Sequence, residues 1–215
     1  MVMGMEKAIL DNVVVSSTKV LVNGRAIEHT CSGNALLTEI YRNRVGDWPK
    51  FFKMDTLSKA GYLATELLIK ERSEARMGCE EFSSSRAIVL FGTTASLCAD
   101  RNYQETIQSA DNYYPSPALF VYTLPNIVTG EIAIRNHYRG ETQFLVMDGF
   151  DADQMAFHIR CAFQDRVTES VLAGWVDSTG NDDFECFVTL VDRDSVSDPA
   201  YLAEQLRLIM NNLKY

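Results

Sequence analysis

The sequence predicts an α/β fold: a five-stranded, mostly parallel sheet with an antiparallel last strand and helices on both faces. Two continuous apolar runs, Arg86–Gly92 and Ser170–Asp177, are typical of strands buried on both sides. Other stretches repeat their apolar residues every three to four positions, which is the helical period. Strands that alternate with helices favour a parallel sheet covered on both faces. A chain of 215 residues is expected to form a single domain, residues 1–215.

The first half begins with β-branched residues and then changes to a helical period. Ala8–Val15 and Thr18–Val22 lead to the turn Asn23-Gly24, which predicts a strand or a hairpin. Apolar residues from Leu57 to Leu68 form one helical face, and Asp55 or Thr56 is placed to cap that helix. The remaining expected segments are a short helix within Cys31–Tyr41, a connection over Ser73–Ser85, the strand Arg86–Gly92, a loop and helix over Thr93–Ala110 and a turn-rich region over Asp111–Pro117.

The second half ends in a hairpin and a helix. A short turn joins Ser170–Asp177 to Phe184–Asp192, so we expect the last strand to be antiparallel. Asp198 before Pro199 predicts the start of the last helix, because Asp caps a helix and Pro suits its first position. The segments expected before the hairpin are a helix from Asn126 to before Arg139, a strand over Thr142–Met147 and a helix capped by Asp151.

Charge and composition exclude several classes of function. The net charge is −9 and the Lys and Arg residues are not clustered, which argues against nucleic-acid binding. No run approaches the roughly 18 apolar residues of a membrane span. Met1–Lys7 lacks the basic and apolar segments of a secretory signal, so a cytoplasmic location is expected.

The cysteines and histidines are scattered and match no metal-binding spacing. We therefore expect free thiols, no metal and no cofactor. Cys98 follows Gly92-Thr93-Thr94, but this pattern is neither a nucleophile motif nor a specific phosphate-binding loop. The residues in question are Cys31, Cys79, Cys98, Cys161, Cys186, His29, His137 and His158.

Three stretches resemble the N-terminal half of the β-ketoacyl synthases. Pro117–Gly140 is similar to a family segment with an apolar run, a Pro-Asn, a small-residue helix and a closing Arg-Gly. Val171–Asp177 (VLAGWVD) resembles the family strand that follows the nucleophile helix, and Phe51–Leu68 resembles an early helix. The resemblance extends from about Ala8 to Arg193. It implies one of the two repeats of a thiolase-like fold.

The resemblance also implies where a nucleophile would be. In active relatives a cysteine starts the helix after the third strand, where the helix N-terminus lowers the pKa of the thiol and backbone amides hold the thioester oxyanion. The alignment places Gly149 at this position, and no cysteine lies within ten residues of it. The histidines or asparagine contributed by the C-terminal half of the family have no counterpart in this chain. We therefore expect no catalytic residue, with Gly149 as a vestigial nucleophile position.

Two groups of residues are the candidate sites. Asp148, Asp151 and Asp153 are interpreted mainly as helix-capping and dipole-complementing groups, with an acid–base or metal role as the alternative. His158 is interpreted as a half-buried histidine rather than a base. The candidate pocket consists of Gly92, Thr93, Thr94, Asn126, Asp148, Gly149, Phe150 and Asp151. The candidate interface is the edge strand Thr142, Gln143, Phe144, Leu145, Val146 and Met147.

The resemblance implies a non-catalytic subunit similar to a chain length factor, acting in fatty acid, polyketide or aryl-polyene-type synthesis. Its expected partner is a full-length ketosynthase or a second copy of itself, with an acyl carrier protein reached through that partner. One alternative is an active β-ketoacyl synthase or acyltransferase with a nucleophile elsewhere. The other is a protein that binds acyl thioesters in the residual pocket.

Overall fold

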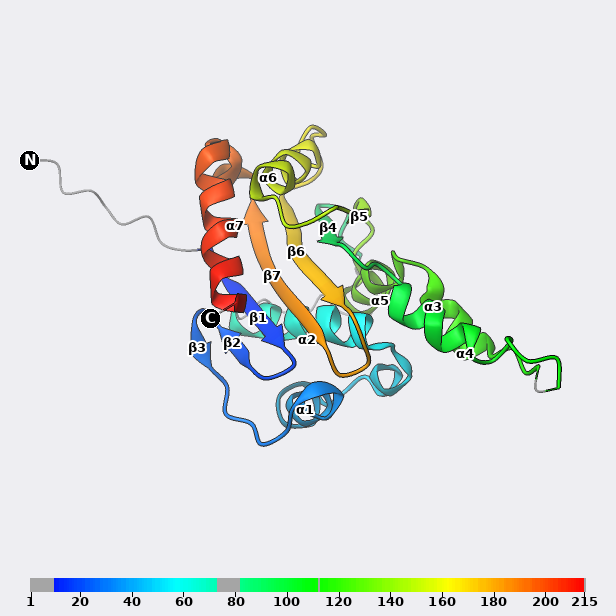
Figure 1. Cartoon of the computed structure of the whole chain (residues 1–215). Coiled ribbons are helices and arrows are strands. Elements are labelled where there is room, and N and C mark those ends of the chain that lie inside the picture. The colour runs from blue at the N-terminus through cyan, green and yellow to red at the C-terminus, as the bar shows by residue number, and fades with distance from the viewer. Residues whose placement is uncertain (1–9, 73–81, 112, 215) are drawn as a thin grey trace, which may run out of the picture.

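The computed structural model describes residues 10–72, 82–111 and 113–214. Cys79, most of the connection Ser73–Ser85 and the beginning of the first expected strand lie outside these residues. The described elements form one sheet with helices on both of its faces (Figure 1).

Among the described residues the sheet has seven strands, in the order β3-β2-β1-β7-β6-β4-β5. Only β4–β5 and β4–β6 are parallel pairs, and the other four pairs are antiparallel. The strands are β1 Asn12–Ser16, β2 Val20–Val22, β3 Arg25–Ala26, β4 Arg86–Gly92, β5 Thr142–Val146, β6 Ser170–Ser178 and β7 Phe184–Asp192.

The prediction of five mostly parallel strands was therefore wrong, whereas the antiparallel last strand is confirmed. Positive φ angles at Asn23 and Gly24 form a tight turn that adds the short third strand β3. β1 pairs with β7, about 170 residues later in the chain, and local periodicity carries no information on this pairing. Alternation of strands and helices identified the parallel part, β4, β5 and β6, correctly.

Side-chain caps start three of the helices where the sequence indicates, at Asp55, Asp151 and Asp198. Asp55 accepts a hydrogen bond from the amide of Ser58, and Asp198 accepts one from the amide of Ala200. The helices are α1 Gly33–Ile40, the π-helix η1 Tyr41–Val45, η2 Pro49–Lys53, α2 Thr56–Glu71, α3 Leu97–Gln104, α4 Pro117–Phe120, η3 Val121–Thr123, α5 Ile127–Asn136, α6 Ala152–Cys161, η4 Arg193–Val196 and α7 Pro199–Lys214.

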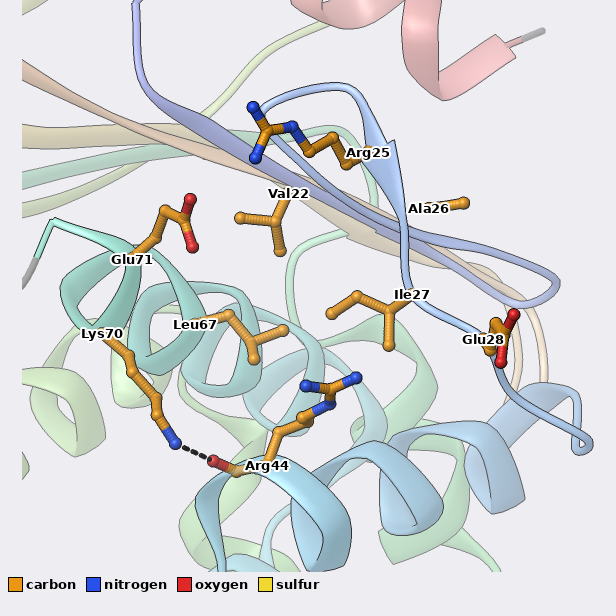
Figure 2. Close-up of a pocket in the computed structure, with 9 residues that line it drawn as sticks. All are labelled: Val22, Arg25, Ala26, Ile27, Glu28, Arg44, Leu67, Lys70 and Glu71. Atoms are coloured by element: carbon orange, nitrogen blue, oxygen red, sulfur yellow. Dashed lines mark hydrogen bonds between the residues drawn. The ribbon is translucent and has the colours of Figure 1, made fainter.

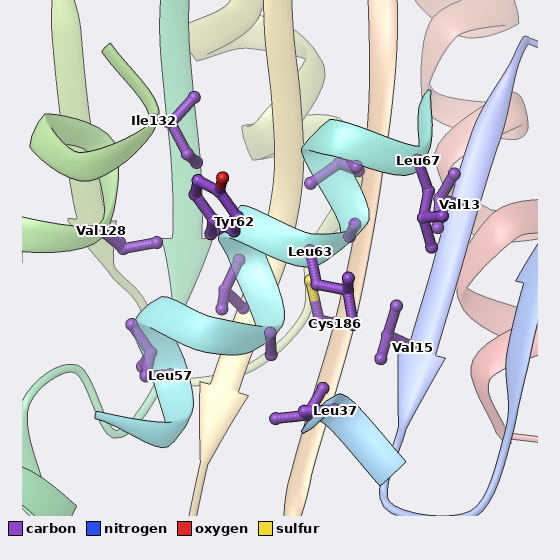
Figure 3. Packing of buried hydrophobic residues seen from close by; sticks show 14 of the residues in the cluster. Val13, Val15, Leu37, Leu57, Tyr62, Leu63, Leu67, Val128, Ile132 and Cys186 are labelled. Atoms are coloured by element: carbon purple, nitrogen blue, oxygen red, sulfur yellow. The ribbon is translucent and has the colours of Figure 1, made fainter. Parts of the chain in front are cut away.

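Two apolar cores hold the helices against the sheet. The first lies beneath α1, α2 and α5, and the second lies beneath α6 and α7. Figure 3 shows α2 between Val13 and Val15 of β1 on one side and Val128 and Ile132 of α5 on the other. Full burial of a side chain such as Leu63 contributes about 1.5–3 kcal/mol. α2 is thus buried on nearly all sides.

No single helix among the described residues is long and apolar enough to cross a membrane. The segments Pro117–Thr123 and Ile127–Asn136 satisfy the length and composition requirement only when taken together, and they meet at a bend of 100°.

Candidate functional site

The helix α6 begins beside the edge strand β5, where the sequence places the vestigial nucleophile. Residues 147–150 connect β5 to Asp151, which caps the helix. One carboxylate oxygen of Asp151 accepts hydrogen bonds from the amides of Asp153 (3.0 Å) and Gln154 (3.1 Å). The hydrogen bond from the Gln154 amide lowers the pKa of Asp151 below its ordinary value, and the one from the Asp153 amide adds to this. The start of α6 therefore holds an ionised carboxylate whose partners are the first free amides of the helix.

A cavity of about 530 Å³ opens at this helix start. A Cβ atom built on Gly149 would meet nothing within 4 Å, so the position faces open space. The lining combines apolar residues of the strand end with polar residues of the loop and helix: Leu145, Val146, Met147, Asp148, Gly149, Phe150, Asp151, Gln154 and His158.

No cysteine is among the described residues that line this cavity. Cys161 is the last residue of α6, about 13 Å along the helix axis from Ala152 at 1.5 Å per residue. Burial raises the pKa of Cys98 and of the fully buried Cys186, which is opposite to the change that activates a thiol. The described part of the chain also contains no group of three or more His, Cys, Asp or Glu side chains suited to a metal ion.

The loop after β4, which was expected in the same pocket, is instead tied to β6. Asp177 accepts hydrogen bonds from the amides of Thr93 (3.2 Å) and Thr94 (2.8 Å) and from both threonine hydroxyls. Gly92 accepts a hydrogen bond from the amide of Met147 (2.9 Å), so the ends of β4 and β5 are adjacent. Gly92, Thr93 and Thr94 do not line the cavity. The polar groups of this loop hold the strand ends together.

Asn126 is also separate from the cavity. It precedes α5, whose buried residues Val128 and Ile132 pack in the core beneath α2. The helix α6 packs in the other core, on the opposite face of the sheet. Of the eight residues expected in the pocket, the structure thus brings together the four from Asp148 to Asp151.

Gln154 and His158 line the cavity although the sequence-based set omitted them. The His158 ring contacts the rings of Phe91 (6.2 Å between centroids) and Phe157 (5.3 Å), and its side chain is half-buried. The sequence could have placed Gln154 and His158 beside Asp151, because positions 151, 154 and 158 are three and four residues apart and share one face of a helix.

The edge beside the cavity is apolar and exposed. Within the described chain β5 pairs with β4 alone, so its other side presents unpaired backbone groups. Val146 of β5, Phe157 of α6 and Ile134 of α5 are 59%, 60% and 58% exposed. Exposed apolar side chains therefore occur on β5 and on helices of both faces of the sheet.

The segment between α3 and α5 carries further exposed apolar side chains. Figure 1 shows α3 and α4 projecting outward on the side of the sheet where β5 lies. Apolar surface on a projecting segment is typical of protein–protein contact. The exposed residues are Tyr113, Tyr114, Leu119, Phe120, Val121 and Leu124.

Comparison with solved structures identifies the fold, whereas comparison of the sequence alone finds no match. No protein-family model matches the chain, and no curated protein matches it. Among solved structures it is similar to "the ishigamide ketosynthase/chain length factor", with 16% identity, a TM-score of 0.63 and coverage of 89% of this chain and 63% of that chain. The chain thus spans less than two thirds of that relative.

Two further structures are similar over most of the chain. One is the ketosynthase ApeO in complex with its chain length factor ApeC from Xenorhabdus doucetiae (14% identity, TM-score 0.50, coverage of 86% and 80%). The other is a type II polyketide synthase acyl carrier protein in complex with its ketosynthase (10% identity, TM-score 0.54, coverage of 87% and 62%). Identities this low establish shape alone. The chain shares the fold of the matched parts of these ketosynthase and chain length factor structures.

Proposed function

We propose that the protein is a non-catalytic, ketosynthase-like subunit that pairs with a full-length ketosynthase, as a chain length factor does. The observation that carries this proposal is the start of α6. There Gly149 stands where the resemblance places a nucleophile, and Asp151 occupies the amides that would otherwise face a ligand.

Two chemical requirements of thioester formation are unmet at this place. Glycine has no side chain to attack a thioester carbonyl, and a carboxylate at the helix start would repel the developing oxyanion. Asp151 carries this negative charge at neutral pH, since the amide of Gln154 lowers its pKa below an ordinary value that is already acidic. A site with these properties supports binding or assembly and offers no acyl transfer.

The unpaired edge of the sheet at β5 supports the partner role. An apolar, unpaired strand at the end of a sheet is a natural site for a second strand. In the related complexes ketosynthases occur with chain length factors, and in one with an acyl carrier protein. We propose that β5 and its neighbours contact a ketosynthase in fatty acid, polyketide or aryl-polyene-type synthesis, in the cytoplasm, and that an acyl carrier protein is reached through this partner. A second copy of the chain is the other occupant of the edge to be tested.

Co-expression with a ketosynthase whose gene lies near the gene for this protein tests the proposal. We expect a stoichiometric complex that survives size-exclusion chromatography, with its mass measured by light scattering. A chain that remains monomeric at micromolar concentration, alone and with such a ketosynthase, would contradict it.

The cavity itself favours one second candidate, a protein that binds an acyl thioester. Its volume of about 530 Å³ lies in the usual range of ligand pockets, and Leu145, Val146, Met147 and Phe150 give its lining an apolar part. Calorimetry with an acyl thioester detects this function without a partner. An active synthase with a nucleophile elsewhere would instead show a mass increase on one cysteine after treatment with cerulenin.

A further inference from the structure

A second cavity, of about 600 Å³, lies at the opposite edge of the sheet from β5. Figure 2 shows it between the β2–β3 hairpin, the π-helix η1 and the end of α2. It shares no lining residue with the cavity at Gly149, and its residues are Val22, Arg25, Ala26, Ile27, Glu28, Arg44, Leu67, Lys70 and Glu71.

The floor of this cavity is apolar and continuous with the core. Leu67 belongs to the buried core, and Val22 and Ile27 pack against that core. In Figure 2 their side chains gather at the centre of the cavity, from three different segments. An apolar group placed on this floor would lose contact with water without any rearrangement of the protein.

Cationic groups flank the floor. In Figure 2, Arg25 and Arg44 lie on opposite sides of the apolar residues. No described residue forms an ion pair or hydrogen bond with either guanidinium, whereas Arg72, Arg135 and Arg207 are each paired with carboxylates. A guanidinium presents several N–H donors suited to a carboxylate or a phosphate.

The remaining charged groups limit how much negative charge the cavity accepts. Lys70 donates a hydrogen bond to the backbone oxygen of Arg44 (3.0 Å), and Glu28 and Glu71 also line the cavity. Three cationic and two anionic side chains leave one net positive charge, in a chain of net charge −9. The lining therefore matches a ligand with a single negative charge.

The backbone at Arg44 is itself unusual. Residues Tyr41–Val45 form a π-helix that ends at Gly46, which has a positive φ of 75°. Single π-helical turns are rare and occur frequently at functional sites. The ring of Tyr41 stacks on that of Phe51 at 4.0 Å between centroids, so the first residue of this turn is anchored in the core while Arg44 reaches the cavity.

We propose that this cavity binds an amphiphilic anion: an apolar body packs on Val22, Ile27 and Leu67, and a carboxylate or phosphate head pairs with Arg44. The site lies at the far edge of the sheet from the proposed partner interface, so it stands independently of the proposed function.

Titration calorimetry of the whole chain with octanoate tests this site. We expect a dissociation constant below about 1 mM, with no heat of binding from acetate, which lacks the apolar body, and none from 1-octanol, which lacks the charge. Octyl phosphate in a parallel titration shows which anionic head the guanidiniums prefer.

Two arginines on the same π-helix give a matched pair of variants. Arg44→Ala is expected to weaken octanoate binding at least tenfold. Arg42→Ala removes the same charge from the same turn, but Arg42 lies over the Phe52 ring, 5.7 Å from its centroid, and not in the cavity, so affinity should stay within twofold. Absence of octanoate and octyl phosphate binding up to 10 mM, equal binding of 1-octanol, or equal effects of the two variants would each overturn the proposal. None of these results bears on pairing through β5.

Discussion

The two edges of the sheet are built differently. At one end, β3 has two residues, both exposed, and a tight turn at Asn23-Gly24 holds it against β2. At the other end, β5 has five residues and exposes Val146, and Phe157 of α6 is exposed as well. Short edge strands are a common protection against unwanted pairing. We call the short edge at β3 the closed edge and the longer edge at β5 the open edge, and the open edge is the one proposed to receive a partner.

The largest expected effect comes from a charge placed at the open edge. Val146→Arg should weaken pairing with a ketosynthase, or with a second copy, at least 100-fold, about 2.8 kcal/mol. The reason is that a guanidinium would be buried at the interface without a partner. Sedimentation velocity over a concentration series measures the change.

Ala26→Arg is the matched control on the closed edge, because Ala26 is also exposed. The Ala26→Arg variant should bind a ketosynthase, or a second copy, as tightly as the unmodified chain does. If both variants weaken pairing equally, or neither does, the two edges do not differ in the way proposed.

A smaller effect is expected on stability, which should distinguish the loop after β4 from the loop after β5. Asp177→Ala removes the acceptor for four hydrogen bonds from Thr93 and Thr94 and should lower the free energy of unfolding by about 2–3 kcal/mol. Asp148→Ala, in the exposed loop after β5, should change it by less than about 0.5 kcal/mol. Urea denaturation compares the two, and a larger loss for Asp148→Ala would contradict the assignment of the β4 loop as the fixed one.

The cap at Asp151 predicts a modest dependence of stability on pH. The amide of Gln154 lowers its pKa below the ordinary 3.8. A lowered folded-state pKa gives stability that is present above pH 3.8 and is lost as pH falls through the folded value. The stability difference between the chain and Asp151→Asn should therefore be full at pH 6 and shrink below about pH 4. A difference that grows on acidification would exclude this role.

The smallest expected effect is that of Gly149→Cys. Because nothing lies within 4 Å of a Cβ atom at this position, stability should change by less than about 0.5 kcal/mol. Mass spectrometry should show that the new thiol reacts with iodoacetamide but is not acylated by octanoyl-coenzyme A. Acylation of this variant would show that the start of α6 still supports thioester chemistry.

Local signals predicted most of the individual elements. The strands Arg86–Gly92 and Phe184–Asp192 have the expected bounds, and Asp55, Asp151 and Asp198 cap helices as expected. These features depend on residues close together in the chain. The pairing of β1 with β7 and the total number of strands depend on contacts between distant segments, which periodicity does not encode.

Only the local part of the candidate site could be predicted, because the rest depends on contacts between distant segments. The loop from Asp148 to Asp151 is contiguous, and the structure keeps it together at the cavity. Thr93 and Thr94 were expected in the same pocket, but the structure ties them to β6 instead. Their hydrogen bonds to Asp177 come from an adjacent strand and were not visible in the sequence.

Hydrogen exchange of the backbone amides tests the difference between the two edges most directly. On mixing with a ketosynthase partner, the amides of Thr142–Val146 should gain protection while those of Arg25–Ala26 remain unchanged. Protection that appears only at β3, or a stable complex in which β5 exchanges as in the free chain, would contradict the proposed use of the open edge.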